Sequence, residues 1–157
     1  MIKELAGDVL AVKEGIICHQ VNYYGVMGAG IAAAIRKKML TETQYAGYVS
    51  CCNKLGRNAL GKVLFITGPD RVIIANMFSQ DDAHINPSDG GITDYRAMLK
   101  CFRQIKTVAE GYHFPVYIPW KVGCGIAGGD WTAVQRIIRS AFNGSSADVF
   151  IVRREEG

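Results

Sequence analysis

The chain has 157 residues, of which 49% are hydrophobic and 20% are charged, and this suits one domain spanning 1–157 with its own core. No run of about 18 apolar residues occurs, so a transmembrane helix is excluded, and the first twelve residues do not resemble a secretory signal. The formal charge of +4 favours an anionic small ligand. No basic run exceeds the triplet 36–38, which argues against nucleic acid.

The cysteines are odd in number and lack CxxC spacing, so neither a disulfide framework nor a zinc site is expected. They are Cys18, Cys51, Cys52, Cys101 and Cys124. The three histidines are scattered and never stand at i, i+4 beside a carboxylate, so no metal motif is present. We expect a monomer in the reducing cytoplasm, with no metal, no cofactor and no membrane partner.

Strand and helix patterns alternate along the chain. Apolar and β-branched runs predict strands at 2–5, 9–12, 16–21, 62–67, 71–77, 116–119 and 149–152. Helical spacing and capping signals predict helices at 31–38, from a capping box at 41–44 to Leu55, at 92–109 and at 131–142. The strands at 62–67 and 71–77 flank a Gly-Pro-Asp turn and suggest a hairpin, and 78–91 is a long polar loop of the kind reserved for function. This order predicts an α/β fold, a three-layer α/β/α domain with a central mixed β-sheet.

Glycine is in excess, with 18 in 157 residues, or about one in nine against a usual level of about 7%. Seven of the 18 lie at positions 25, 28, 30, 123, 125, 128 and 129, in two loops that each run from a strand toward a helix. Loops at the carboxyl ends of strands in open α/β sheets bind ligands, and glycine lets the backbone approach a phosphate. Two such loops suit a pyrophosphate. The first loop reads GxxGxG rather than GxGxxG, and no P-loop pattern occurs.

Four segments together resemble a macrodomain, in the right order and over nearly the whole chain. They read GDV at 7–9, CHQVN at 18–22, GVMGAGI at 25–31 and GCGIAGGDW at 123–131. The sequence looks closest to the branch that contains ADP-ribose-1″-phosphate phosphatases, terminal ADP-ribose glycohydrolases and antitoxins that remove ADP-ribose from DNA. The resemblance implies ADP-ribose, or an ADP-ribosylated substrate, as the partner, and hydrolysis at the anomeric carbon of the distal ribose.

The resemblance also implies roles for individual residues. Asp8 and the Val9 backbone would hold the adenine, while Asn22 and His19 would lie near the distal ribose. The two glycine loops would hold the pyrophosphate from opposite sides. The residues expected to contact the ligand from these loops and from the long polar loop are Gly25, Met27, Gly28, Ala29, Gly30, Ile31, Ser79, Gln80, Val122, Gly123, Cys124, Gly125, Ile126 and Ala127.

Two departures from the glycohydrolase pattern affect the mechanism. The segment 75–82 contains no lysine, and Ala127 stands where those enzymes carry an aspartate, so a lysine adduct is not carried over. His19 and Asp130 are the candidate catalytic residues, with Asp82 and His84 as further groups that could orient a water. The position of His19 is equally compatible with a buried core histidine. Asp130 directly precedes a helix and can instead be its N-cap.

Three functions follow from these observations. The first is a hydrolase acting on an ADP-ribose derivative, with ADP-ribose-1″-phosphate as the leading substrate. The second is a module that binds ADP-ribose or a related NAD metabolite without turnover. The third, carried only by the net charge and by Tyr23, Tyr24, Trp120 and Trp131, is a single-stranded nucleic-acid binder.

Overall fold

A six-stranded sheet with the strand order β1-β6-β5-β2-β4-β3 forms the middle of the protein in a computed structural model, which describes residues 1–154. The strands are β1 (Ile2–Ala6), β2 (Glu14–Val21), β3 (Val63–Thr67), β4 (Arg71–Phe78), β5 (Val116–Pro119) and β6 (Val149–Arg153). All neighbours pair in parallel except β3, which is antiparallel to β4. The carboxyl ends of the five parallel strands therefore share one edge of the sheet.

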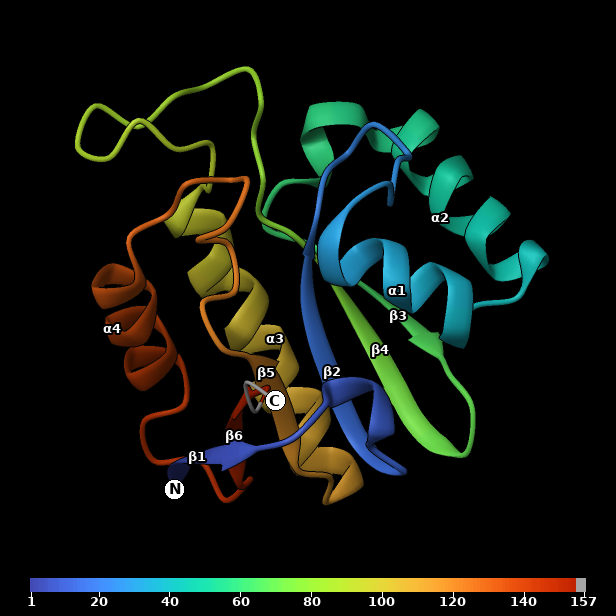
Figure 1. Ribbon diagram of the computed structural model, residues 1–157, viewed down its shortest axis with the longest axis vertical. Coiled ribbons are helices and arrows are strands. Elements are labelled where there is room, and N and C mark those ends of the chain that lie inside the picture. Colours follow the sequence, from blue (N-terminus) through green and yellow to red (C-terminus); the bar gives the residue numbers. More distant parts are fainter. Residues whose placement is uncertain (155–157) are drawn as a thin grey trace.

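Helices cover both faces of this sheet (Figure 1). They are α1 (Gly30–Met39), α2 (Glu42–Leu55), α3 (Tyr95–Tyr112) and α4 (Trp131–Ala141). The helices α3 and α4 pack on one face, and α1 and α2 lie over the other. The predicted three-layer fold with a mixed sheet is confirmed. Within residues 1–154, no helix is both long enough and apolar enough to cross a bilayer.

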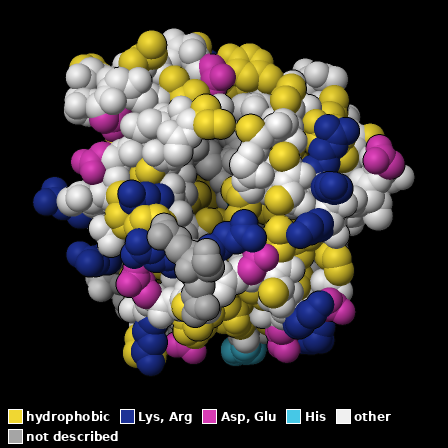
Figure 2. Space-filling view, in the orientation of Figure 1, with side chains coloured by type: hydrophobic (Ala, Val, Ile, Leu, Met, Phe, Trp, Pro, Cys, Tyr) yellow, Lys and Arg dark blue, Asp and Glu magenta, His cyan; other side chains and the backbone are white. Residues whose placement is uncertain are grey.

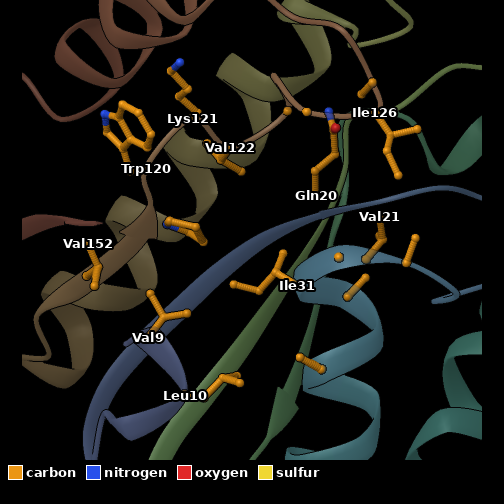
Figure 3. Close-up of a pocket in the computed structure, with 18 of the residues that line it drawn as sticks. Val9, Leu10, Gln20, Val21, Ile31, Trp120, Lys121, Val122, Ile126 and Val152 are labelled. Atoms are coloured by element: carbon orange, nitrogen blue, oxygen red, sulfur yellow. The ribbon is translucent and has the colours of Figure 1, made fainter. Parts of the chain in front are cut away.

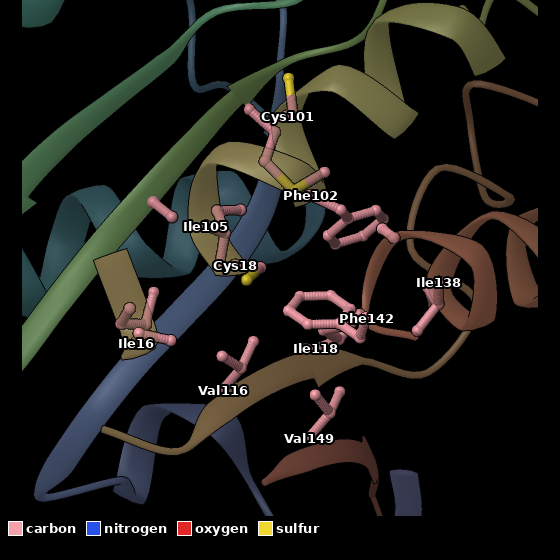
Figure 4. Close-up of a cluster of buried hydrophobic side chains, with 14 of the residues drawn as sticks. Ile16, Cys18, Cys101, Phe102, Ile105, Val116, Ile118, Ile138, Phe142 and Val149 are labelled. Carbon is pink, nitrogen blue, oxygen red and sulfur yellow. The ribbon is translucent and has the colours of Figure 1, made fainter. Parts of the chain in front are cut away.

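Strand alternation decides which helices each residue of β2 faces. Ile16 and Cys18 belong to the core shared with α3 and α4, where the Phe102 and Phe142 rings lie 5.8 Å apart (Figure 4). Ile17 packs instead with the cluster that contains residues of α1. Because the side chains of a strand alternate with period 2, His19 shares the α1 face and Gln20 shares the α3 face.

Several predicted elements are found with their expected local chemistry. The Thr41 hydroxyl accepts from the Gln44 N–H at 3.1 Å, and the Gln44 side chain accepts from the Thr41 N–H at 2.9 Å, so the capping box is confirmed. The hairpin is also confirmed, since β3 and β4 pair across the turn at 68–70. The last helix begins at Trp131, as predicted.

Two boundaries differ from the prediction because an aspartate caps a helix there. The strand predicted at 9–12 is wrong: Val9–Ala11 is a 3₁₀ helix, and the Asp8 carboxylate accepts from the Leu10 N–H at 2.9 Å. Capping by a short acidic side chain thus overrides the β-branched pattern. Similarly, α3 begins at Tyr95 rather than 92, where the Asp94 carboxylate accepts from the Ala97 N–H at 2.9 Å.

Gly47 lies exposed inside α2, and a Cβ added there meets no atom within 4 Å. We expect Gly47→Ala to raise the free energy of unfolding by about 0.5–1 kcal/mol, because alanine removes the conformational entropy cost of glycine within a helix. Urea unfolding measures this change. Gly56→Ala is the control with the opposite sign, since Gly56 has φ of 52° at the end of the same helix. Equal stabilisation by both variants would contradict the argument.

Candidate functional site

A cavity of about 1030 Å³ opens at the shared carboxyl edge of the parallel strands (Figures 2 and 3). Every parallel strand or the segment that follows it contributes to its walls, as expected for ligand sites of open α/β sheets. The lining residues predicted from the sequence are Asp8, Val9, Asn22, Gly28, Ala29, Gly30, Ile31, Gln80, Val122, Gly123, Gly125, Ile126 and Ala127. The volume is at the upper end of the range of about 300–1,000 Å³ typical of small-molecule sites.

The two ends of the cavity differ in chemistry. Val9, Val152 and Trp120 gather at one end, whereas Gln20 and Ile126 lie toward the other (Figure 3). The first end offers apolar surface, with the Asp8 carboxylate beside it. The wall also contains three carboxamides that already donate within the protein, Asn22 to the Val26 carbonyl, Gln20 to the Ser79 carbonyl and Gln80 to the Asp82 carboxylate. An elongated ligand with a flat apolar part and a hydroxyl-rich part would match this polarity.

The first glycine loop, 22–29, is held in shape from behind. The Asn22 amide donates to the Val26 carbonyl at 2.8 Å and accepts from the Tyr24 N–H at 3.0 Å. Two tyrosines of α2 donate to the loop carbonyls, Tyr45 to Gly25 at 2.8 Å and Tyr48 to Asn22 at 2.7 Å. These bonds satisfy carbonyl groups on the side away from the cavity and fix the loop before any ligand arrives.

The N–H groups on the cavity side of this loop have no such partners. The N-cap position of α1, Ala29, has no side-chain hydrogen bond to the helix. Within residues 1–154, no protein group accepts from the N–H of any residue in 28–32. The start of a helix carries a partial positive charge, so this row of donors is suited to an anion.

The second glycine loop presents a similar row of donors. Its internal bonds run from the Cys124 N–H to the Lys121 carbonyl at 2.9 Å and from the Gly128 N–H to the Gly125 carbonyl at 3.0 Å. The N–H groups of Gly125, Ile126 and Ala127 donate to no group in the described chain. Two rows of unpartnered backbone donors thus line one cavity, an arrangement that binds phosphate groups.

The helix after the second loop does not take part in this donor set. Asp130 caps α4 by accepting from the Thr132 N–H at 3.0 Å, and it lies outside the cavity wall. The interpretation of Asp130 as the N-cap of this helix is confirmed, and its catalytic role stays a prediction. The expectation that both loops deliver a helix N-terminus holds only for α1; the second loop contributes its own backbone instead.

The loop 79–94 holds the second glycine loop in place. The Gln20 amide donates to the Ser79 carbonyl at 3.0 Å, and the Thr93 hydroxyl donates to the Gly123 carbonyl at 2.6 Å. The Ile92 N–H donates to the Ala127 carbonyl at 2.8 Å. The contact is so close that a Cβ at Gly91 would lie 2.6 Å from the same carbonyl oxygen. Loop 79–94 therefore sets the position of one wall of the cavity.

A buried carboxylate anchors the start of that loop. Asp81 accepts from the Tyr23 hydroxyl at 2.7 Å and from the Arg57 guanidinium at 2.8 Å. Burial alone would raise the pKa of Asp81, but these hydrogen bonds outweigh it and lower the pKa. Because Tyr23 belongs to the first glycine loop, this cluster ties the first loop to loop 79–94.

His19 does not face the ligand space. It is fully buried on the α1 face of β2, its Nε2 lies 2.6 Å from the Asn76 side-chain oxygen, and it is absent from the cavity wall. Asn76 donates through its own amide to the Leu64 carbonyl at 2.8 Å, so its oxygen is the acceptor and Nε2 carries the proton. Burial lowers the pKa of His19 to about 4. The structure shows His19 as a buried core histidine, and its catalytic and ligand roles stay predictions.

Four other predicted residues also lie behind the wall. They are Gly25, Met27, Ser79 and Cys124. Met27 and Ser79 are buried, and burial together with the nearby Asp130 carboxylate raises the pKa of the Cys124 thiol to about 11, so it is protonated at neutral pH. Asp82 and His84 are exposed in loop 79–94 and do not line the cavity.

Several lining residues were not predicted as ligand contacts. They are Gly7, Leu10, Gln20, Val21, Val26, Ala32, Ala34, Pro119, Trp120, Lys121, Val152, Arg153 and Arg154. Some of them follow β5 and β6, and the parallel order of those strands would have brought them to the same edge. Gln20 and Val21 lie on opposite faces of β2 and both line the cavity, so their position at the carboxyl end of the strand, rather than its alternation, brings them there.

Comparisons with known proteins agree with this architecture. No family model and no curated protein matched the chain. Among solved structures, the macrodomain of DarG from Mycobacterium tuberculosis is similar with a TM-score of 0.79 and 22% identity over 99% of each chain. A macrodomain protein from Streptomyces coelicolor is similar with a TM-score of 0.75 and 24% sequence identity over 100% of each chain. Thermosipho africanus DarTG, in complex with ADP-ribose, is similar with a TM-score of 0.71 and 16% sequence identity, over 95% of this chain and 40% of that one.

The fold and the cavity define a three-layer α/β protein with a ligand site at the carboxyl edge of its sheet. The three similar structures identify the architecture further: the chain has the macrodomain fold.

The buried His19 makes stability depend on pH. Its pKa of about 4 in the folded protein lies below the value of about 6.5 for an unfolded chain, so the unfolded state binds more protons between these values. We expect the free energy of unfolding to fall by about 2 kcal/mol from pH 7 to pH 5 through this residue. Urea unfolding at both pH values, for wild type and His19→Gln, isolates the contribution. An equal loss in the two proteins would contradict it.

Proposed function

We propose that this protein binds ADP-ribose in the cavity at the carboxyl edge of the sheet. One observation carries the proposal: the unpartnered N–H groups of 28–32 and of 125–127 line the same cavity. A pyrophosphate between two such rows loses its hydrogen bonds to water and gains charge-assisted hydrogen bonds from donors that are already fixed in position. The donors are backbone groups, so binding needs no charged side chain at the phosphates.

The polarity of the cavity gives the ligand a direction. The apolar end formed by Val9, Val152 and Trp120 suits the adenine, and the Asp8 carboxylate there suits an exocyclic amino group. The amides of Asn22 and Gln80 at the other end suit the hydroxyls of the distal ribose. The resemblance of the GDV and MGAGI segments to macrodomains supports the same direction, as does the ADP-ribose held by Thermosipho africanus DarTG.

Binding without turnover fits the side chains of the cavity better than hydrolysis does. The ionisable groups in the described wall are Asp8 and three cations, Lys121, Arg153 and Arg154. Asp8 lies at the adenine end and already accepts from the Leu10 N–H. The polar side chains of the wall near the expected distal ribose are carboxamides, which do not accept a proton from an attacking water. The Asp82 carboxylate accepts from the Gln80 amide at 2.9 Å and lies outside the wall. An ADP-ribose-1″-phosphate phosphatase or an ADP-ribosyl hydrolase is therefore the second candidate, carried by sequence resemblance.

Gly125 offers a direct test of the binding site. A Cβ at this position meets no atom within 4 Å, so Gly125→Glu places a negative charge beside the expected pyrophosphate without a clash inside the protein. We expect wild type to bind ADP-ribose in calorimetric titration, and this variant to bind at least about tenfold more weakly because like charges repel. Its thermal midpoint should match that of wild type.

The matched control is Gly47→Glu, which adds the same charge on the exposed face of α2, away from the cavity. It should retain wild-type affinity. Absence of binding by wild-type protein at millimolar ADP-ribose would overturn the proposed function.

Turnover is tested with ADP-ribose-1″-phosphate. Because the described wall holds no proton acceptor near the distal ribose, we expect wild-type protein to release phosphate only at the rate of buffer. The Gly125→Glu variant serves as a purification control, since a contaminating phosphatase would act equally in both samples. Release by wild type that is lost in the variant would make the protein a hydrolase.

A further inference from the structure

Positive charge gathers at the rim of the adenine end of the cavity. The Arg153 guanidinium carbon lies 3.9 Å from the centre of the Trp120 ring, and the Lys121 ammonium nitrogen lies 4.5 Å from it. The two cations are therefore held within about 8 Å of one another, less than a Debye length of about 10 Å at 0.1 M salt. Arg154 lines the same cavity.

These cations have no acidic partner among residues 1–154, where the ion pairs involve Lys13, Arg57 and Arg71 instead. Lys121 and Arg153 also lie at the Trp120 end of the cavity, away from the donor rows that would hold the pyrophosphate. The two rows of donors at 28–32 and 125–127 are built from backbone and carry no charged side chain. In the proposed pose the phosphates of ADP-ribose lie at these donor rows, so the exposed cations of the rim are left available for a further anionic group.

The backbone at this rim holds Lys121 in a conformation that favours glycine. The Val122 N–H donates to the Pro119 carbonyl at 3.0 Å, which closes a turn directly after β5. Lys121 is the third residue of this turn and has φ of 60°, in the left-handed region. Glycine would adopt this φ with less strain than lysine does, so the lysine at this position lowers the stability of the fold. It extends outward beside Trp120 (Figure 3).

We propose that the rim formed by Trp120, Lys121 and Arg153 binds a phosphate group on the adenosine ribose, and that the preferred ligand class is an ADP-ribose phosphorylated at this sugar. The inference rests on the proposed function, which places the adenosine at this end. Lys121 and Arg153 are exposed residues of the cavity wall, so they can reach a phosphate on an adenosine ribose that is bound at this end. Arginine and lysine at such a position select phosphorylated nucleotides by charge-assisted hydrogen bonds.

The test compares matched ligands that differ by one phosphate. Calorimetry measures ADP-ribose against ADP-ribose 2′-phosphate, and competition measures AMP against adenosine 2′,5′-bisphosphate and adenosine 3′,5′-bisphosphate. We expect a phosphorylated form to bind wild-type protein about tenfold more tightly than its parent at low salt. The ratio should shrink at 0.5 M salt, because the rim cations are exposed to screening.

The variant Lys121→Gly with Arg153→Gln should bring the affinity ratio close to one. Glycine suits the φ of Lys121, so the thermal midpoint of the variant reports whether the fold is intact. The control Lys38→Gln with Arg139→Gln removes two exposed cations outside the cavity and should keep the wild-type ratio.

The outcomes separate the two proposals. If ADP-ribose binds and every phosphorylated ligand binds no more tightly than its parent, the inference about the rim is overturned and the proposed function stands. If the preference survives in the rim variant, the rim is not its source and the inference is again overturned. If ADP-ribose and its phosphorylated forms all fail to bind, the proposed function fails and this inference fails with it.

Discussion

The structure of the site depends on how two glycine loops satisfy their backbone groups. Buried or half-buried carbonyls need donors, and side chains behind the loops supply them: Tyr45 and Tyr48 for the first loop, Thr93 for the second. The N–H groups on the cavity side are left without protein partners. The loops are thus fixed in position by bonds to their carbonyls while their donors remain available. This division produces an anion site with little rearrangement on binding.

The sheet topology explains why these loops meet. Five strands run in parallel, so every connection that leaves their carboxyl ends emerges at one edge. The segment after β1 and the end of β6 bring Asp8 and Arg153 to the cavity, while β2 and β5 lead into the two glycine loops. Loop 79–94, after β4, then bonds to the second of them through Ile92 and Thr93. The cavity is therefore a consequence of strand order together with one long connecting loop.

Much of the fold could be predicted from the sequence because its signals are local. The capping box at Thr41, the hairpin turn and the start of α4 at Trp131 each depend on a few adjacent residues. The contacts that shape the site are not local: Gln20 bonds to Ser79, and Thr93 bonds to Gly123, across stretches of chain whose relative position depends on the whole sheet. The position of His19 has a simpler reason. Val21, on the same face of β2, lines the cavity, but His19 lies two residues further from the strand end, where it is buried and bonds to Asn76 of the neighbouring strand β4.

The position of these residues along β2 bears on whether this cavity is catalytic. β2 presents Gln20 and Val21 to the cavity and keeps His19 buried behind them, so it offers a carboxamide rather than a titratable imidazole. The register is fixed by the core, because Ile16 and Cys18 must face α3 and α4. The same choice places Gln20 where it bonds to Ser79, so the residue that replaces a potential base also helps to hold a wall of the cavity. A carboxylate at position 20 would lose the donation to Ser79 and so disturb the wall that loop 79–94 and the second glycine loop form together.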